Sequence, residues 1–125
     1  MGRVYLALQE GEDFSRRLAI KIVAPEGDRP DIERRFRHER RILASLEHPG
    51  IARFHAAGCH EHGRWYPALE YVVGASLLEL ARQRALGAPE RLRLFLAVLE
   101  AVGFAHSRSV VHRDLKPSNI LVGAD

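Results

Sequence analysis

Residues 110–122 read VVHRDLKPSNILV, and this stretch decides how the rest of the chain is interpreted. Asp114, Lys116 and Asn119 place a carboxylate, an ammonium group and an amide within six positions. A buried turn between two strands has no need of all three together, so the stretch favours catalysis over a purely structural turn.

The stretch is similar to the catalytic loop H-R-D-x-x-x-x-N of protein kinases. By this resemblance Asp114 orients the substrate hydroxyl and accepts its proton, Lys116 neutralises the transferred phosphoryl group, and Asn119 holds a magnesium ion. A lysine two positions after the aspartate is typical of serine/threonine kinases. The resemblance therefore implies ATP and Mg²⁺ as cofactors and protein serine or threonine hydroxyls as substrates, with bacterial members of the family as the best match.

A second motif, residues 18–21 with the sequence LAIK, resembles the kinase strand V-A-I-K, whose lysine binds the α- and β-phosphates. The apolar residues that follow at helical spacing are Ile32, Phe36, Leu43 and Leu46. Glu39 occupies the one missing position of this inward stripe, where an unpaired buried carboxylate would cost several kcal/mol. We therefore expect Glu39 to pair with Lys21 within about 4 Å, although Lys21 by itself could be an exposed lysine on an edge strand.

The other nucleotide contacts are implied by the resemblance alone. Residues 1–7 look like the closing half of the glycine-rich loop, of which only the last glycine, Gly2, is present. The segment around Glu70 and Val72 would bind adenine through its backbone. The remaining contacts are Val4, Ala19 and Leu121 around the base and Ser76 at the ribose.

The hydrophobic pattern predicts an α+β chain. The expected strands are 4–8, 18–23, 51–57 and 65–72, and apolar strands are also expected on both sides of the catalytic loop. The expected helices are one that begins after a cap at Asp31, then 77–86 and 89–106. Together with the resemblance, this predicts a partial two-lobe protein-kinase fold, with residues 1–73 as a β-rich N-lobe without its first strand and 74–125 as the start of the C-lobe. Gly74 is the expected hinge.

The composition bears on nucleic-acid binding, cellular compartment and membrane insertion. The net charge of +3 comes from basic residues that are scattered and, around residues 31–41, mixed with acidic ones, which favours a solvated helix face over nucleic-acid binding. The single cysteine, Cys59, cannot form an internal disulfide and suits the cytoplasm. The most apolar stretch, 92–105, is interrupted by charged residues and Gly103, so no membrane-spanning segment is expected.

Three alternatives were weighed. Small-molecule phosphotransferases of the aminoglycoside and choline type usually read H-G-D in this loop, so Arg113, Lys116 and Pro117 favour the protein kinases. A zinc site in the residues His55, Cys59, His60 and His62 matches none of the usual spacings. A non-catalytic pseudokinase-like fragment or gene remnant stays open, because no D-F-G motif follows the loop. We expect the chain by itself to be inactive and marginally folded without the remaining kinase segments.

Overall fold

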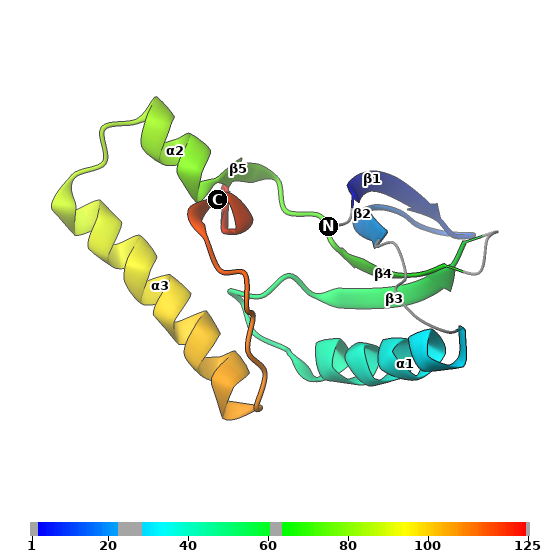
Figure 1. Ribbon diagram of the computed structural model, residues 1–125. Coiled ribbons are helices and arrows are strands. Elements are labelled where there is room, and N and C mark those ends of the chain that lie inside the picture. The colour runs from blue at the N-terminus through cyan, green and yellow to red at the C-terminus, as the bar shows by residue number, and fades with distance from the viewer. Residues whose placement is uncertain (1–2, 23–28, 61–63, 125) are drawn as a thin grey trace. The chain divides into compact units, whose positions relative to one another are not determined.

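The computed structural model describes residues 3–22, 29–60 and 64–124 (Figure 1). The chain divides into two compact units. The first comprises Met1–Glu47 and Ala52–Tyr71, and the second comprises His48–Ile51 and Val72–Asp125. Gly2, the expected glycine of the phosphate loop, lies outside the described residues.

The first unit contains an antiparallel four-stranded sheet in the order β1-β2-β4-β3. Its strands are β1 (Arg3–Glu10), β2 (Ser15–Ile22), β3 (Phe54–Cys59) and β4 (Trp65–Glu70). The turn between β1 and β2 is closed by the Gly11 N–H, which donates to the Phe14 carbonyl at 2.8 Å. All four strands were predicted from the sequence, but β3 begins three residues later than expected.

Helix α1 (Arg29–Ser45) covers one face of this sheet, as Figure 1 shows. Phe36 stacks on Trp65 of β4, with ring centroids 5.3 Å apart. The helix begins two residues before Asp31, so the predicted cap at Asp31 is wrong. Pro30 fits the first turn because its missing N–H would have no partner there, and the Asp31 carboxylate stabilises the positive end of the helix dipole.

The second unit contains α2 (Leu77–Gln83), α3 (Ala88–Ser107), the 3₁₀ turn η1 (Pro117–Asn119) and a small sheet of β5 (Gly74–Ser76) and β6 (Leu121–Gly123). The strand expected after the catalytic loop is therefore confirmed as β6. The apolar pair at 110–111 does not form the strand expected before the loop, and β5 was not predicted. No helix in the described parts of the chain is long and apolar enough to cross a membrane.

Gly74, the hinge expected from the sequence, lies within the second unit. It is the first residue of β5 and is paired with Gly123 of β6. A Cβ atom at Gly74 would overlap the backbone carbonyl of Val122. The absence of a side chain is therefore required by the close approach of two strands.

The apolar surface of α3 is largely exposed. Leu92, Leu96 and Leu99 have exposed fractions of 61%, 58% and 48%, and Phe95 is 58% exposed. The buried contact of this helix is instead near its C-terminal end, where Ala101 is buried and Phe104 packs against His48 with ring centroids 5.1 Å apart.

A polar chain of three side chains crosses the sheet of the first unit. Arg16 donates through Nε to Gln9 Oε1 at 2.6 Å and through Nη1 to His55 Nδ1 at 3.1 Å. Burial lowers the pKa of His55, and the nearby positive charges of Arg16 and Arg53 lower it further, while Glu70 opposes them. His55 is therefore held neutral, as an acceptor for Arg16.

This environment predicts a pH dependence of stability. Because the folded-state pKa of His55 lies below its unfolded value of about 6.5, the unfolded chain binds the proton more readily. The contribution of His55 is complete above the unfolded pKa and is lost as the pH falls through 6.5 toward the folded pKa. Thermal melts between pH 7.5 and 5 test this prediction. The melting temperature of His55→Gln should fall less on acidification than that of the wild type. Equal slopes of melting temperature against pH in the two proteins would contradict this assignment.

Candidate active site

The catalytic-loop residues predicted from the sequence converge in the second unit. The Asp114 carboxylate lies 3.6 Å from Lys116 Nζ through Oδ1 and accepts a hydrogen bond from Asn119 Nδ2 through Oδ2 at 3.1 Å. Asn119 Nδ2 also donates to the Asp114 backbone carbonyl at 2.8 Å. The Asp114 N–H donates to His112 Nδ1 at 3.2 Å. The carboxylate, ammonium and amide groups are thus within hydrogen-bonding or ion-pair reach of one another, and all are solvent-exposed.

The backbone of the loop is held in an uncommon conformation. Arg113 has φ 69°, in the left-handed region, where a residue with a side chain costs on the order of 1–3 kcal/mol. On the C-terminal side of the loop, the Asn119 N–H closes η1 by donating to the Lys116 carbonyl at 2.9 Å. The next residue, Ile120, accepts from the Leu77 N–H at 2.7 Å, which ties the loop to the start of α2. These contacts fix Asn119 relative to Asp114.

The same loop offers oxygen atoms suited to magnesium. Mg²⁺ is bound in proteins by carboxylate and amide oxygens. Asn119 donates both of its hydrogen bonds to Asp114 through its nitrogen. The side-chain oxygen of Asn119, Oδ1, makes no hydrogen bond to the described residues. Asn119 Oδ1 and the Asp114 carboxylate therefore fit a hard divalent cation.

In the first unit, strand register gathers the expected nucleotide-binding residues on one face of the sheet. Val4 is paired with Lys21, and Ala19 is paired with Leu6 on one side and Leu69 on the other. Directly opposed residues of neighbouring strands point to the same face, and so do residues two apart on one strand. Trp65 shares this face of β4 with Leu69 and stacks on α1. Val4, Ala19 and Lys21 thus lie on the face that α1 covers.

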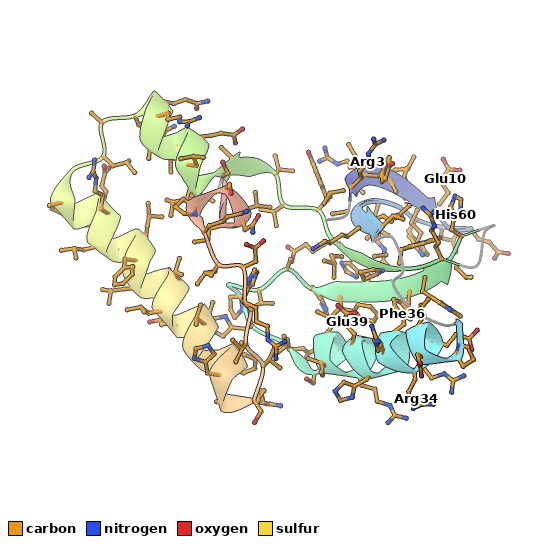
Figure 2. The ribbon with its side chains drawn as sticks, viewed as in Figure 1. Arg3, Glu10, Arg34, Phe36, Glu39 and His60 are labelled. Carbon is orange, nitrogen blue, oxygen red and sulfur yellow. The ribbon has the colours of Figure 1, made fainter. Side chains whose placement is uncertain are left out.

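The expected ion pair between Lys21 and Glu39 is not formed. Glu39 does lie on the strand-facing side of α1 together with Phe36, opposite Arg34 (Figure 2). Both Lys21 and Glu39 are nevertheless exposed, and the ion pairs among the described residues do not include them. A hydrated carboxylate pays little desolvation cost, so burial does not force Glu39 to take a cationic partner in this structure.

The segment expected to bind adenine is in the structure a link between the two units. Glu70 ends β4, where its N–H donates to the Arg53 carbonyl at 2.7 Å and its carboxylate accepts from the Arg53 N–H at 3.1 Å. Val72 is half-buried and belongs to the second unit. Ser76 and Leu121 are paired across β5 and β6, so their side chains share a face of the small sheet.

Ser76 has a structural role that the sequence analysis missed. Its hydroxyl accepts from the Glu79 N–H at 3.1 Å, and its own N–H donates to Glu79 Oε2 at 2.9 Å. Hydrogen bonding of the Glu79 carboxylate by the backbone N–H of Ser76, and further by its side chain, lowers the pKa of Glu79. The two residues form a capping box for α2, and the pattern Ser-x-x-Glu at 76–79 is the signal that would have predicted it.

Removal of this cap gives a measurable prediction. Ser76→Ala should lower the free energy of unfolding by about 1 kcal/mol, because the Glu79 N–H loses its acceptor. Ser76→Gly should cost only a few tenths of a kcal/mol. Urea denaturation of the three proteins provides the comparison, and equal midpoints would show that the hydroxyl does not stabilise α2.

The rarity of lysine among the basic residues is a further feature that the sequence analysis missed. The chain has 19 basic residues, but only two are lysines, Lys21 and Lys116, and the other 17 are arginines. Lysine and arginine are not interchangeable where a compact ammonium must approach phosphate oxygens as a point charge. The two lysines occupy the two positions that the motifs assign to phosphate contacts.

His55, Cys59 and His60, the described members of the histidine and cysteine group, form no comparable site. Among the residues that the structure describes, no three His, Cys, Asp or Glu side chains are grouped closely enough to hold a metal ion. His55 is instead engaged by Arg16, and Cys59 Sγ lies 3.6 Å from the His60 carbonyl. His62 lies outside the described residues.

Known proteins with a similar sequence and fold are protein kinases. A family model described as the protein kinase domain matches residues 1–125. The chain is 35% identical over 123 residues to the serine/threonine-protein kinase PknJ of Mycobacterium tuberculosis, covering 98% of this chain and 20% of that protein. The crystal structure of a cysteine-to-alanine mutant of the M. tuberculosis PknI kinase domain is similar with a TM-score of 0.79 and 31% identity, over 100% of this chain and 51% of that one. The crystal structure of Rad53 (residues 1–466) in complex with AMP-PNP is similar with a TM-score of 0.82 and 28% identity, over 99% of this chain and 32% of that one. The chain thus spans about a fifth of the curated relative and half of the solved PknI domain.

Proposed function

This chain belongs to the protein kinase family, and on that premise we propose that the protein carrying it transfers the γ-phosphoryl group of ATP to serine or threonine hydroxyls of other proteins. The observation that carries the proposal is the convergence of Asp114, Lys116 and Asn119 in one loop held by the neighbouring sheet. These groups meet the three chemical demands of phosphoryl transfer.

The proposed roles follow from the charges and atoms of the loop. Asp114 accepts the proton of the attacking hydroxyl as the new bond from that oxygen to the γ-phosphorus forms and the bond from phosphorus to the bridging oxygen of ADP breaks. Lys116, 3.6 Å from Asp114, neutralises the phosphoryl oxygens during the transfer. The Asn119 side chain holds Asp114 through two hydrogen bonds from its nitrogen and would bind Mg²⁺ through its oxygen. Bound Mg²⁺ would neutralise negative charge on the β- and γ-phosphates.

The nucleotide would be bound by the residues that the family motifs mark. In the first unit, Val4 and Ala19 supply an apolar face for adenine, and Lys21 on that same face supplies the charge for the α- and β-phosphates. We propose that nucleotide binding brings Glu39 to Lys21, since Glu39 already lies on the strand-facing side of α1. The other proposed contacts are Gly2, Glu70, Val72, Ser76 and Leu121. The similarity to Rad53, solved with AMP-PNP, supports an adenine nucleotide.

Substrate class and location complete the proposal. Lys116, two positions after the catalytic aspartate, favours serine and threonine over tyrosine, and the relative PknJ bears the name of a serine/threonine kinase. A protein kinase that uses cellular ATP would act in the cytoplasm, and the exposed free thiol of Cys59 is compatible with a reducing compartment.

The proposal is tested by incubating the full-length protein that contains residues 1–125 with ATP labelled on its γ-phosphate, Mg²⁺ and a generic protein substrate. We expect label on phosphoserine and phosphothreonine after acid hydrolysis, and its loss when EDTA removes the metal. Label found only on phosphotyrosine would refute the substrate class. Transfer to aminoglycosides or choline but not to protein would refute the protein-kinase assignment.

A further inference from the structure

The positive charge of the chain is concentrated in α1. This helix contains six arginines and three acidic residues, a net charge of +3, which equals the net charge of the whole chain. The remaining residues therefore contain 13 basic and 13 acidic side chains. The excess charge that looked scattered in the sequence belongs to one 17-residue helix.

Part of this charge is grouped on one face of the helix. Glu39 lies on the strand-facing side with Phe36, whereas Arg34 lies on the opposite side (Figure 2). At 100° per residue, Arg37, His38 and Arg41 follow Arg34 on that outward side, and all four side chains are exposed. We call Arg34, Arg37 and Arg41 the arginine row, which extends over about 10 Å of helix at 1.5 Å per residue.

Among the described residues, the ion pairs neutralise little of this row. Asp31 reaches Arg34 at 3.9 Å, with side-chain exposed fractions of 53% and 81%, so this contact is weak. The ion pairs among the described residues include neither Arg37 nor Arg41. Like charges three or four positions apart destabilise a helix by a few tenths of a kcal/mol each. The row therefore lowers the stability of α1, and a bound anionic partner would reverse that effect.

We propose that the outward face of α1 binds an acidic segment of a partner protein, with three carboxylates within about 10 Å of one another. Guanidinium groups match carboxylates through paired hydrogen bonds, which explains arginine at every position of the row. A membrane surface fits less well, because the apolar side of α1 packs on the sheet and cannot enter lipid. Single-stranded nucleic acid fits less well, because the outward face carries one small ring, that of His38, and no Phe, Tyr or Trp side chain for base stacking.

The test measures the fluorescence anisotropy of a labelled nine-residue peptide in which glutamate alternates with serine. A peptide with glutamine in place of glutamate is the probe control. The variant combines Arg34→Gln, Arg37→Gln and Arg41→Gln. A matched control combines Arg82→Gln, Arg84→Gln and Arg93→Gln, which remove three exposed arginines of the second unit. Both lower the net charge equally.

We expect the row variant to bind the acidic peptide at least about tenfold more weakly than the wild type, and the control variant to stay within about twofold. Equal weakening by both variants would show a general charge effect and overturn the proposal. The wild type is also tested against a DNA duplex and against anionic vesicles. If either binds more tightly than the peptide, and that binding is lost in the row variant, the choice of partner is overturned.

Folding is followed by circular dichroism in the same samples. Removing like-charge repulsion should leave the melting temperature of the row variant unchanged or raise it. If the row variant melts lower, the single variant Arg41→Gln is used, and unchanged peptide affinity in that variant would count against the proposal. The assay needs neither nucleotide nor turnover, so its outcome is independent of the proposed kinase activity.

Discussion

Asp114→Asn should lower kcat for phosphoryl transfer by about 10²–10⁴-fold, the usual contribution of a positioned proton acceptor. An amide cannot accept the hydroxyl proton, and it removes the negative charge that lies 3.6 Å from Lys116 Nζ. Asparagine keeps the size of the side chain and an oxygen that can accept from Asn119. The melting temperature should therefore change little, and the loss should appear in kcat and not in protein yield.

The matched control for this measurement is Asp13→Asn, which neutralises an exposed carboxylate in the turn between β1 and β2. Steady-state rates are measured with the full-length protein at saturating Mg-ATP. Turnover of Asp114→Asn within a few-fold of the wild type would contradict the role of Asp114. An equal loss in Asp13→Asn would point to a general effect of charge.

Gly74→Ala should lower the free energy of unfolding by about 1–3 kcal/mol or more, because the new Cβ would overlap the Val122 carbonyl. A flexible side chain could move away, but here the neighbouring atom belongs to the backbone of the paired strand. Separation of β5 from β6 would also loosen the turn that holds Asn119, so activity should fall together with stability.

Gly123→Ala is the internal control for this prediction. Gly123 is the partner of Gly74 in the same ladder, yet a Cβ at Gly123 would meet no described atom within 4 Å. Urea denaturation followed by circular dichroism should show a large midpoint shift for Gly74→Ala and almost none for Gly123→Ala. Equal midpoints for the two variants would mean that the overlap at Gly74 is relieved with no loss in the free energy of unfolding.

The sequence predicted the elements whose patterns are local. The strands of the first sheet follow from β-branched and apolar runs, and α1 and α3 follow from helical spacing. The convergence of Asp114, Lys116 and Asn119 was expected because the three residues are close in sequence and one turn at Pro117 brings them together.

The failures concern contacts that depend on distant segments. Strand β5 has three residues and forms only because β6, more than forty residues later, supplies its partner. The pairing of Glu39 with Lys21 was argued from burial, and Glu39 proved to be hydrated. The grouping of Arg34, Arg37 and Arg41 on one face of α1 was hidden because a linear sequence mixes the faces of a helix.

The most direct test of the account uses the fact that Lys21 and Lys116 are the only lysines of the chain. An acyl phosphate derivative of ATP transfers its acyl group to amines that lie beside the bound phosphates. The account predicts that mass spectrometry will find both lysines of residues 1–125 acylated, and that excess Mg-ATP will protect them while surface amines elsewhere in the protein stay unprotected. Labelling of Lys21 and Lys116 that is no greater than that of surface amines and is unaffected by Mg-ATP would contradict the assignment of these residues to a nucleotide site.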